Sequence, residues 1–387
     1  MAVNLTNILK LIQKKAAVVD TNTSTQDLID LFKAAKLADG SLVVEADSAG
    51  ALPDIASSTG TLVFQKDVGT LKLNNGVWDT LGVEAVEAAL PTQAQGSVSG
   101  YTSAGFFGTK NVIDKFSFAA DGNATDVGDL TQARYASAGQ SSTVSGYTSG
   151  GSLWPASLQN TIDKFPFASD ANATDVGDLT LVNYTATGQS STTSGYTSGG
   201  RTNPLGAQTF VNVIDKFPFA ADGNATDVGD ITLGTGRYGP AGQSSDVSGY
   251  TSQGYFTSGF SNVIDKFSFA ADGNATDVGD LTRVAVYATG TNSIESGYTS
   301  GGSGPAFTNI IDKFPFASDA NATDVGDLTT VKRQAAGQSS GASGYSSGGK
   351  VPAQSNIIDK FPFASDGNAT DVGDLTVGRY SAAGQQV

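Results

Sequence analysis

Hydrophobic and polar positions follow one pattern that recurs six times along this chain. Each copy contains a run like NVIDKFSFAADGNATDVGDLT, first met at residues 111–131, in which apolar and polar side chains tend to alternate. The copies begin at Asn111, Asn160, Asn212, Asn262, Asn309 and Asn356. Alternation is typical of half-buried β-strands. A period of 47 to 52 residues indicates one supersecondary unit per copy, stacked on its neighbours to share a core.

Each copy divides into four strand-like pieces separated by turn residues. In the second copy these are residues 135–142 (YASAGQSS), 145–151 (SGYTSGG), 161–168 (TIDKFPFA) and 173–180 (ATDVGDLT). Four antiparallel strands make one blade of a β-propeller. Strands crowd together near a propeller axis, so we expect the small-residue piece innermost and the aromatic IDKFPF piece further out. Residues 97–387 are therefore predicted to form a mainly β, six-bladed propeller.

The carboxyl-terminal piece is predicted to close the ring. The repeating part begins with a second-strand piece around Tyr101 and ends with an innermost-type run, residues 380–385 (YSAAGQ). The last strand should therefore complete the first blade, which would remove an exposed sheet edge.

The order of the pieces resembles the kelch-type β-propeller. The resemblance rests on the pairs that end the second strand, Gly150-Gly151, Gly199-Gly200, Gly301-Gly302 and Gly348-Gly349, and on an aromatic third strand containing Phe116 and Phe118. Two copies depart from it, with Ala104-Gly105 and Gln253-Gly254, and the tryptophan expected after the third strand is absent. The resemblance covers about three quarters of the chain and implies the fold rather than an activity.

Residues 1–96 form a separate leader with two predicted amphipathic helices, over residues 5–19 and 28–35. Their apolar stripes include Leu5, Ile8, Ile12, Leu28, Leu31 and Phe32. A helix this small must bury its stripe on its own domain or on another chain. The leader is accordingly either a small α+β domain of its own or an anchoring module that also oligomerises the chain.

Residues 61–81 alternate around two turns and predict a three-stranded meander. Within it, residues 62–81 (LVFQKDVGTLKLNNGVWDTL) resemble the strand-rich modules of tailed-phage structural proteins. That resemblance is short, and it implies a virion location with other virion proteins as partners.

Composition and charge exclude several functions. The chain has no cysteine and no histidine, so thiolate nucleophiles, Cys/His zinc sites and histidine-based triads are excluded. A net charge of −15 without a basic patch argues against nucleic-acid binding. Lys10, Lys14 and Lys15 interrupt the first apolar run, so we expect neither a signal peptide nor a membrane span.

The recurring DGNATDVGD, first at residues 121–129, has oxygen-bearing side chains at alternate positions, as calcium loops do. The sixth position is Asp126 rather than the glycine that such a loop requires. A turn between two strands is the simpler interpretation, and we expect no metal and no cofactor.

Acidic residues repeated in every copy make poor catalysts, because one active site must break the symmetry of its scaffold. The unrepeated carboxylates, Asp246 and Glu295, occupy equivalent turns of neighbouring blades. A glycosidase-like pair is one interpretation and solvated turn residues the other. The sequence favours a protein that is not an enzyme. The repeated Asp114 and Lys115 are interpreted as polar strand edges that bridge neighbouring blades.

The copies differ most in the link from the second to the third strand. These links carry aromatic and basic residues: Phe106, Phe107, Trp154, Arg201, Phe210, Tyr255, Phe256, Phe260, Phe307 and Lys350. Links from the fourth strand to the next first strand, with Arg134, Arg237, Arg283, Arg333 and Arg379, should reach the same face. Similar blades with variable, aromatic-rich loops favour a binding face, the alternative being ordinary loop drift.

Together these features predict a non-enzymatic virion protein of a tailed phage, a fibre or appendage component. Its leader would attach to other virion proteins, and its propeller would present a recognition face to a host-surface glycan or protein. Two alternatives remain, a capsid or tail decoration protein with a purely structural propeller and a secreted bacterial lectin or carbohydrate-active enzyme.

Overall fold

The computed structural model describes residues 95–387, except residues 109, 154, 156 and 204–208, together with four short strands nearer the amino terminus. The chain divides into two compact units, Met1–Pro91 and Thr92–Val387. In the part of the chain that is described, no helix is long and apolar enough to cross a membrane.

In the first unit, the described residues are the strands β1 (Val44–Ala46), β2 (Leu62–Gln65), β3 (Thr70–Asn74) and β4 (Trp78–Leu81). Strands β2, β3 and β4 pair antiparallel in sequence order, as the predicted meander requires. Strand β1 adds a parallel partner to β2, which the sequence did not suggest. The two predicted helices and their anchoring residues lie outside the described residues.

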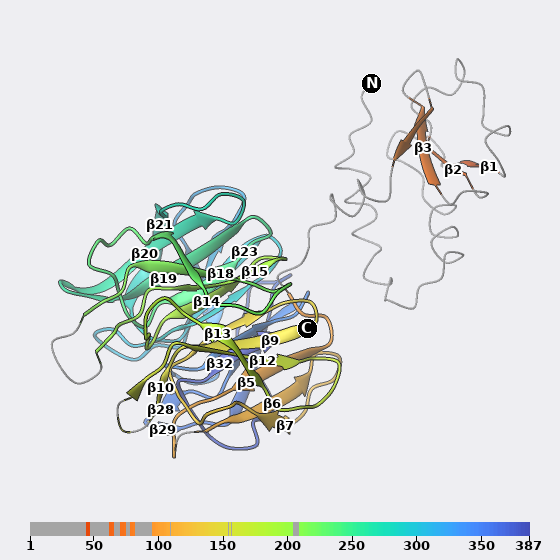
Figure 1. Ribbon diagram of the computed structural model, residues 1–387. Helices are drawn as coiled ribbons and strands as arrows, with labels where there is room; N and C mark the ends of the chain where they lie inside the picture. Colours follow the sequence, from red (N-terminus) through yellow and green to blue (C-terminus); the bar gives the residue numbers. More distant parts are fainter. Residues whose placement is uncertain are drawn as a thin grey trace. The chain divides into compact units, whose positions relative to one another are not determined.

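The second unit is a six-bladed β-propeller of four-stranded antiparallel sheets, which confirms the predicted architecture (Figure 1). The innermost strands are β32 (Ala383–Gln386), β8 (Ala138–Ser141), β14 (Thr187–Ser190), β18 (Ala241–Ser244), β22 (Thr289–Asn292) and β26 (Ala336–Ser339). The second strands are β5 (Ser99–Ser103), β9 (Ser145–Ser149), β15 (Ser194–Ser198), β19 (Ser248–Phe256), β23 (Ser296–Ser300) and β27 (Ser343–Ser347). Blade 1 therefore contains β32 and β5, and blade 6 contains β26 and β27.

The outer half of each blade carries the repeated aromatic and acidic pieces. The third strands are β6 (Val112–Ser117), β12 (Thr161–Pro166), β16 (Val213–Pro218), β20 (Gly259–Ser268), β24 (Ile310–Pro315) and β30 (Ile357–Pro362). The fourth strands are β7 (Thr125–Asp129), β13 (Thr174–Asp178), β17 (Thr226–Asp230), β21 (Thr276–Ala285), β25 (Thr323–Asp327) and β31 (Thr370–Asp374). Two links add small ribbons, β10 (Ser152–Leu153) with β11 (Ser157–Leu158) and β28 (Lys350–Val351) with β29 (Ala353–Gln354).

The carboxyl-terminal strand β32 is the innermost strand of the first blade, where it pairs antiparallel with β5 (Figure 1). Three backbone amides, those of Ser97, Val98 and Ser99, also donate to the carbonyl of Val387 at 2.6 to 3.0 Å. The two ends of the repeating region therefore share one sheet, as the run at residues 380–385 predicted.

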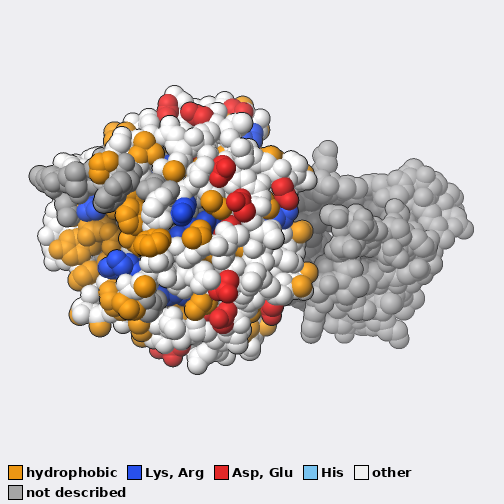
Figure 2. Space-filling model, turned by 90° about the horizontal axis from the view of Figure 1, so that it is seen from below, with side chains coloured by type: hydrophobic (Ala, Val, Ile, Leu, Met, Phe, Trp, Pro, Cys, Tyr) orange, Lys and Arg blue, Asp and Glu red, His pale blue; other side chains and the backbone are white. Residues whose placement is uncertain are grey.

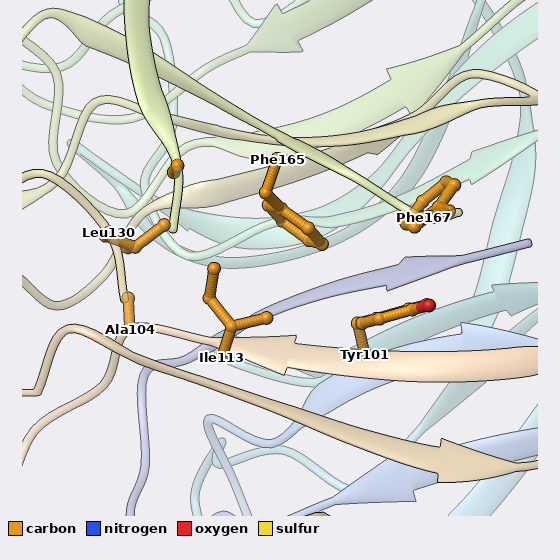
Figure 3. Close-up of a cluster of buried hydrophobic side chains, with 7 residues drawn as sticks. Tyr101, Ala104, Ile113, Leu130, Phe165 and Phe167 are labelled. Atoms are coloured by element: carbon orange, nitrogen blue, oxygen red, sulfur yellow. The ribbon is translucent and has the colours of Figure 1, made fainter. Parts of the chain in front are cut away.

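The hydrophobic core lies between the blades rather than at the axis. In the first junction, Tyr101 and Ile113 of blade 1 pack against Phe165 and Phe167 of blade 2 (Figure 3), with the Tyr101 ring centroid 5.6 and 4.8 Å from the two phenylalanine rings. Equivalent clusters fill the other five junctions. Gly146 lies opposite Phe165 across the sheet, and a methyl group there would overlap the ring. The aromatic third strand thus fills the space where blades diverge.

At the axis the innermost strands meet through six equivalent glycines. They are Gly139, Gly188, Gly242, Gly290, Gly337 and Gly384, and a Cβ on any of them would clash with the carbonyl oxygen of the equivalent glycine in a neighbouring blade. The small-residue strand is therefore innermost, as predicted, because no Cβ fits at its glycine position.

Pro166 ends the third strand of blade 2. It faces Ser145 of the second strand, whereas pairing with the fourth strand stops two residues earlier, at Lys164. Its missing N–H therefore costs no hydrogen bond to the fourth strand.

Candidate ligand-binding face

One mouth of the axial opening is encircled by a closed ring of six backbone hydrogen bonds. The amide of Ala136 donates to the carbonyl of Ser381 at 2.7 Å, and the amide of Thr185 donates to the carbonyl of Ala136 at 2.9 Å. Gly239, Tyr287, Gln334 and Ser381 continue the same pattern around the axis. All six residues have positive φ, between 55° and 64°. This mouth ring lies where the links from the fourth strand enter the innermost strands.

The residue before each member of the mouth ring pairs with the residue that follows the Gly-Gly position. The isolated bridges are Phe106 with Tyr380, Tyr135 with Ser152, Tyr184 with Arg201, Tyr238 with Tyr255, Val286 with Ser303, and Arg333 with Lys350. Two concentric sets of variable residues therefore surround the mouth, one from each kind of link. We call their aromatic and basic members, with Phe210, Phe260, Tyr287 and Phe307, the belt.

Aromatic contacts connect the belt across several blades. The ring of Phe106 lies 4.8 Å from that of Tyr135 and 5.3 Å from that of Tyr380, and Tyr135 contacts Tyr184 edge to face at 5.7 Å. Further round the mouth, Tyr238 contacts Phe210, Tyr255 and Tyr287 at centroid distances of 5.5 to 5.7 Å. Tyr255 packs on Phe260 at 5.1 Å. These rings are half-buried, so each keeps part of its surface open to solvent.

Three cations of the belt lie over aromatic rings. The guanidinium carbon of Arg201 is 4.8 Å from the ring of Tyr184 and 4.6 Å from that of Tyr238, so this side chain lies between two rings. Arg333 lies 5.0 Å from the ring of Phe307, and the Lys350 ammonium 5.0 Å from that of Tyr380. Such contacts contribute about 0.5 to 2 kcal/mol each. They also fix where the charges lie.

The belt breaks the symmetry of the ring at Tyr287. Its equivalents in the mouth ring are small or polar, whereas the Tyr287 ring occupies the space beside Gly239, where a Cβ would come within 2.9 Å of it. Burial raises the pKa of Tyr287 far above its ordinary value, although Arg201 and Arg333 both favour the ionised form. The phenol is therefore neutral at physiological pH. Arg333 lies 6.0 Å from the Tyr287 ring, and Arg201 lies over Tyr238, whose ring contacts that of Tyr287 at 5.7 Å.

None of the three belt cations forms an ion pair with a described carboxylate. Every other described ring cation that pairs does so within a blade junction, as Lys115 does with Asp170 of the next blade at 3.1 Å. In the view of Figure 2, hydrophobic side chains lie beside Lys and Arg on one part of the propeller surface, with Asp and Glu mostly apart from them.

Most of the predicted binding residues are brought together in the belt: Phe106, Arg201, Phe210, Tyr255, Phe260, Phe307 and Lys350. Phe107 is 52% exposed and Phe256 ends β19 opposite Gly259, outside the ring contacts described above. Trp154 lies outside the described residues.

The tyrosines that connect the belt were not among the predicted binding residues; they are Tyr135, Tyr184, Tyr238, Tyr287 and Tyr380. A signal was present, because a tyrosine precedes the small-residue run in four copies, at residues 135, 184, 238 and 380. It was interpreted as the start of the innermost strand rather than as part of the variable face.

The arginines expected on this face are mostly structural, which corrects the prediction for them. Arg134, Arg237 and Arg379 are fully buried and pair with Asp163, Asp265 and Asp114 at 2.7 to 3.2 Å. Arg283 is largely buried beside Asp312 at 2.8 Å. In five blades the buried aspartate pairs with a cation of the preceding link, and in blade 6 that cation is Lys332. Only Arg333 of this set therefore belongs to the belt.

The repeated acidic residues hold neighbouring blades together. Asp163 of blade 2 accepts hydrogen bonds from the amide and hydroxyl of Thr131 in blade 1, at 3.0 and 2.7 Å. Asp163 is fully buried, so the prediction of a polar strand edge was wrong, whereas the bridge between blades is confirmed. The lysine beside each such aspartate also bridges, as Lys360 does with Asp121 at 2.8 Å.

The DGNATDVGD segments also act between blades. Asn123 Oδ1 accepts from the amide of Asp374, which belongs to the neighbouring blade, at 3.1 Å. Asp126 accepts from the amide of Gly128 within its own turn at 3.2 Å. Among the described residues, no group of three or more acidic side chains is placed to hold a metal ion.

The remaining unrepeated carboxylates lie in turns at the other end of the innermost strands. Asp246 lies between β18 and β19, beside a cavity of about 240 Å³ that Gln95 and Ser97 also line. Burial raises the pKa of Asp246. Glu295 lies in the equivalent turn between β22 and β23, so neither carboxylate belongs to the belt.

Comparison with models of known protein families and with curated proteins finds no match for this chain.

Proposed function

We propose that the protein is a non-enzymatic structural protein of a tailed-phage virion, a fibre or appendage component whose propeller recognises a host-surface molecule. The observation that carries this proposal is the concentration of variable side chains in the belt, on a scaffold whose other positions are nearly identical in six copies. Large aromatic side chains and arginine are the residues enriched where proteins bind partners.

The place where the chain enters the propeller supports separate roles for the leader and the belt. Gln95 and Gly96 bond to Asn292 and Ser339, at the ends of innermost strands away from the mouth ring. The belt is therefore not the face at which the chain enters the propeller. In this proposal the leader, through Leu5, Ile8, Ile12, Leu28, Leu31 and Phe32, attaches to other virion proteins and brings copies of the chain together.

The blades are proposed to be of the kelch type. The support is local geometry, because the Gly-Gly pairs that end the second strands have positive φ at both positions, 63° and 102° at Gly150 and Gly151. Ala104 and Gln253 have the same conformation in the two copies that lack the first glycine, with φ of 64° and 52°. The kelch assignment concerns architecture and adds no activity.

The experiment compares the purified full chain with a belt variant, Phe106→Ala with Tyr255→Ala, for binding to a panel of bacterial cells. A control variant, Val144→Ala with Val247→Ala, changes exposed apolar residues in turns at the other end of the strands. We expect the belt variant to lose cell binding and the control to keep it, with a cooperative unfolding transition retained in both.

Electron microscopy of antibody-labelled particles tests the virion location. Cells that carry the gene are induced, and released particles are expected to bear the label on the tail or its appendages. Labelled particles combined with no belt-dependent cell binding would favour the decoration protein instead. Absence of the protein from particles would overturn the virion proposal.

A further inference from the structure

The belt presents positive charge without a negative partner. Arg201, Arg333 and Lys350 form no ion pair with the described residues, and the Nε atoms of both arginines are buried without a hydrogen bond. The guanidinium carbon of Arg201 lies 4.8 and 4.6 Å from two tyrosine ring centroids, so the charge is held between these rings. A guanidinium carries five N–H donors in one plane. These groups suit the two oxygens of a carboxylate, which a guanidinium binds as a pair.

The charge on this face differs in sign from the charge of the chain. The net charge is −15, yet the repeated aspartates are buried in blade junctions, as Asp163 is, or lie in the outer turns, as Asp121 does. Local positive charge within an acidic molecule selects acidic ligands and excludes cationic ones. Three cations are too few for nucleic-acid binding, which depends on many phosphate contacts.

Aromatic faces lie beside each cation. Phe307 is 50% exposed and lies 5.0 Å from Arg333. Tyr238 lies 4.6 Å from Arg201, and the half-buried ring of Tyr255 contacts Tyr238 at 5.5 Å. An exposed ring beside a fixed guanidinium offers an apolar surface and a charge at one place. A sugar ring that carries a carboxylate has the same two properties, an apolar C–H face and a planar acid.

The two arginines are placed to act on one ligand. Arg201 belongs to blade 3 and precedes blade 4, and Arg333 lies in the link into blade 6. Arg333 lies 6.0 Å from the Tyr287 ring, and Arg201 lies 4.6 Å from the ring of Tyr238, which contacts Tyr287 at 5.7 Å. A chain of acidic sugars would pass over the mouth and meet both cations.

We propose that the belt binds an acidic polysaccharide through its carboxylates, with Arg201 and Arg333 as the carboxylate ligands and Phe307 and Tyr255 against the sugar rings. This inference rests on the proposed recognition function and names its ligand chemistry. The carboxylate, not the identity of the sugar, is the feature that the cations select.

The test measures binding of the full chain to polygalacturonate, alginate and hyaluronate by calorimetry, and to polygalacturonate whose acids are methyl-esterified. Esterification keeps the sugar chain and removes its charge. We expect binding to at least one acidic polymer and loss of binding on esterification. Raising the salt concentration should also weaken binding, because part of the attraction is between partly exposed charges.

The protein variants are Arg201→Gln with Arg333→Gln and, as a matched control, Lys115→Gln with Lys313→Gln. The control removes the same charge from partly exposed bridges between blades. Loss of two charge-assisted contacts should weaken binding by roughly 100-fold, whereas the control should change it by less than about twofold. A single cooperative unfolding transition shows that each variant folds.

The outcomes separate the two proposals. Cell binding that depends on Phe106 and Tyr255, together with no arginine-dependent binding to any of the three acidic polymers, overturns the carboxylate inference and leaves the recognition face standing. Equal binding of the esterified polymer also overturns it. Cell binding that no belt variant reduces overturns the recognition face itself. Loss of binding both on esterification and in the arginine variant supports the inference.

Discussion

Blade 2 and the sector formed by blades 3 to 5 have nearly the same sequence but differ at three buried positions. In blade 2, Arg134 pairs with the buried aspartate, and Gln140 connects the second strands of blades 2 and 3. Gly150 ends the second strand with a positive φ. The sector departs once in each blade, with Asn183 in blade 3, Gln253 in blade 4 and Thr291 in blade 5. Each departure leaves a buried side-chain atom without a partner.

A glutamine of the innermost strand joins the second strands of two neighbouring blades in five of the six junctions. Gln140 Nε2 donates to Ser149, Tyr196 and Thr197, and so connects blades 2 and 3 at 2.9 to 3.0 Å. Gln189, Gln243, Gln338 and Gln385 make the same contacts elsewhere. Because each departure affects a different kind of contact in a different blade, the neighbouring contacts in that blade remain in place.

The largest change in the free energy of unfolding is expected when the Arg237–Asp265 pair is replaced by the arrangement of blade 3, where Asn183 takes the place of the arginine. Arg237→Asn would leave Asp265 buried without its cation, which now lies 2.7 Å away. Removing one partner of a buried pair costs about 3 to 5 kcal/mol, and chemical denaturation would measure it. The double variant with Asp265→Asn should recover part of the loss. A cost below about 1 kcal/mol would contradict the view that the cation offsets the buried charge.

Restoring the glycine in blade 4 should stabilise the protein. Gln253 is fully buried at a φ of 52°, and both atoms of its amide lack a partner. Gln253→Gly removes a buried unsatisfied amide and a left-handed conformation that favours glycine, so we expect a gain of about 2 kcal/mol. The matched variant Gly150→Gln in blade 2 should lose a similar amount. A loss in both variants would show that Gln253 makes a contribution of its own.

The free energy of unfolding should depend on pH through the buried carboxyl of Asp215 in blade 3. Within the described residues no cation pairs with Asp215, and burial raises its pKa despite two hydrogen bonds from Thr180. A carboxyl whose folded pKa is raised stabilises the fold while protonated, and this contribution is lost as the pH rises through the folded pKa.

Asn183→Arg supplies the missing cation and lowers that pKa. Its gain over the natural protein should therefore grow from about pH 3 to pH 7 and reach about 1 kcal/mol. Leu181→Arg is the control, because it adds the same charge at an exposed position of the same link. A gain that does not change with pH would exclude Asp215 as its cause.

The smallest effect is expected in blade 5. Thr291 takes the place of the junction glutamine, and its hydroxyl lacks a partner, as do those of Ser300 and Ser346. Thr291→Gln should connect these groups and stabilise the ring by about 1 kcal/mol. The reverse change, Gln243→Thr in blade 4, should destabilise it by a similar amount, as measured by the shift in unfolding midpoint. Opposite signs in the two variants are the expected outcome.

The repeats made the fold predictable and the link side chains less so. Blade number, strand order and closure followed from six equivalent tyrosines and from the final YSAAGQ, because a strand period and a small-residue run have one geometric meaning. The position of Arg134 depends on Asp163 in the next blade, 29 residues further on by number, and no local pattern reveals that contact. Tyr287 and Arg201 come together only through the curvature of the ring.

The contact between innermost glycines also bears on how such a chain can change over generations. Unequal recombination between the DNA segments that encode six nearly identical repeats can add or remove whole copies. A ring of five or seven blades has a different radius, and the glycines at residues 139, 188, 242, 290, 337 and 384 would no longer rest on the carbonyl beside them. The backbone at the axis therefore acts as a filter on copy number, while the links around the mouth remain free to diverge.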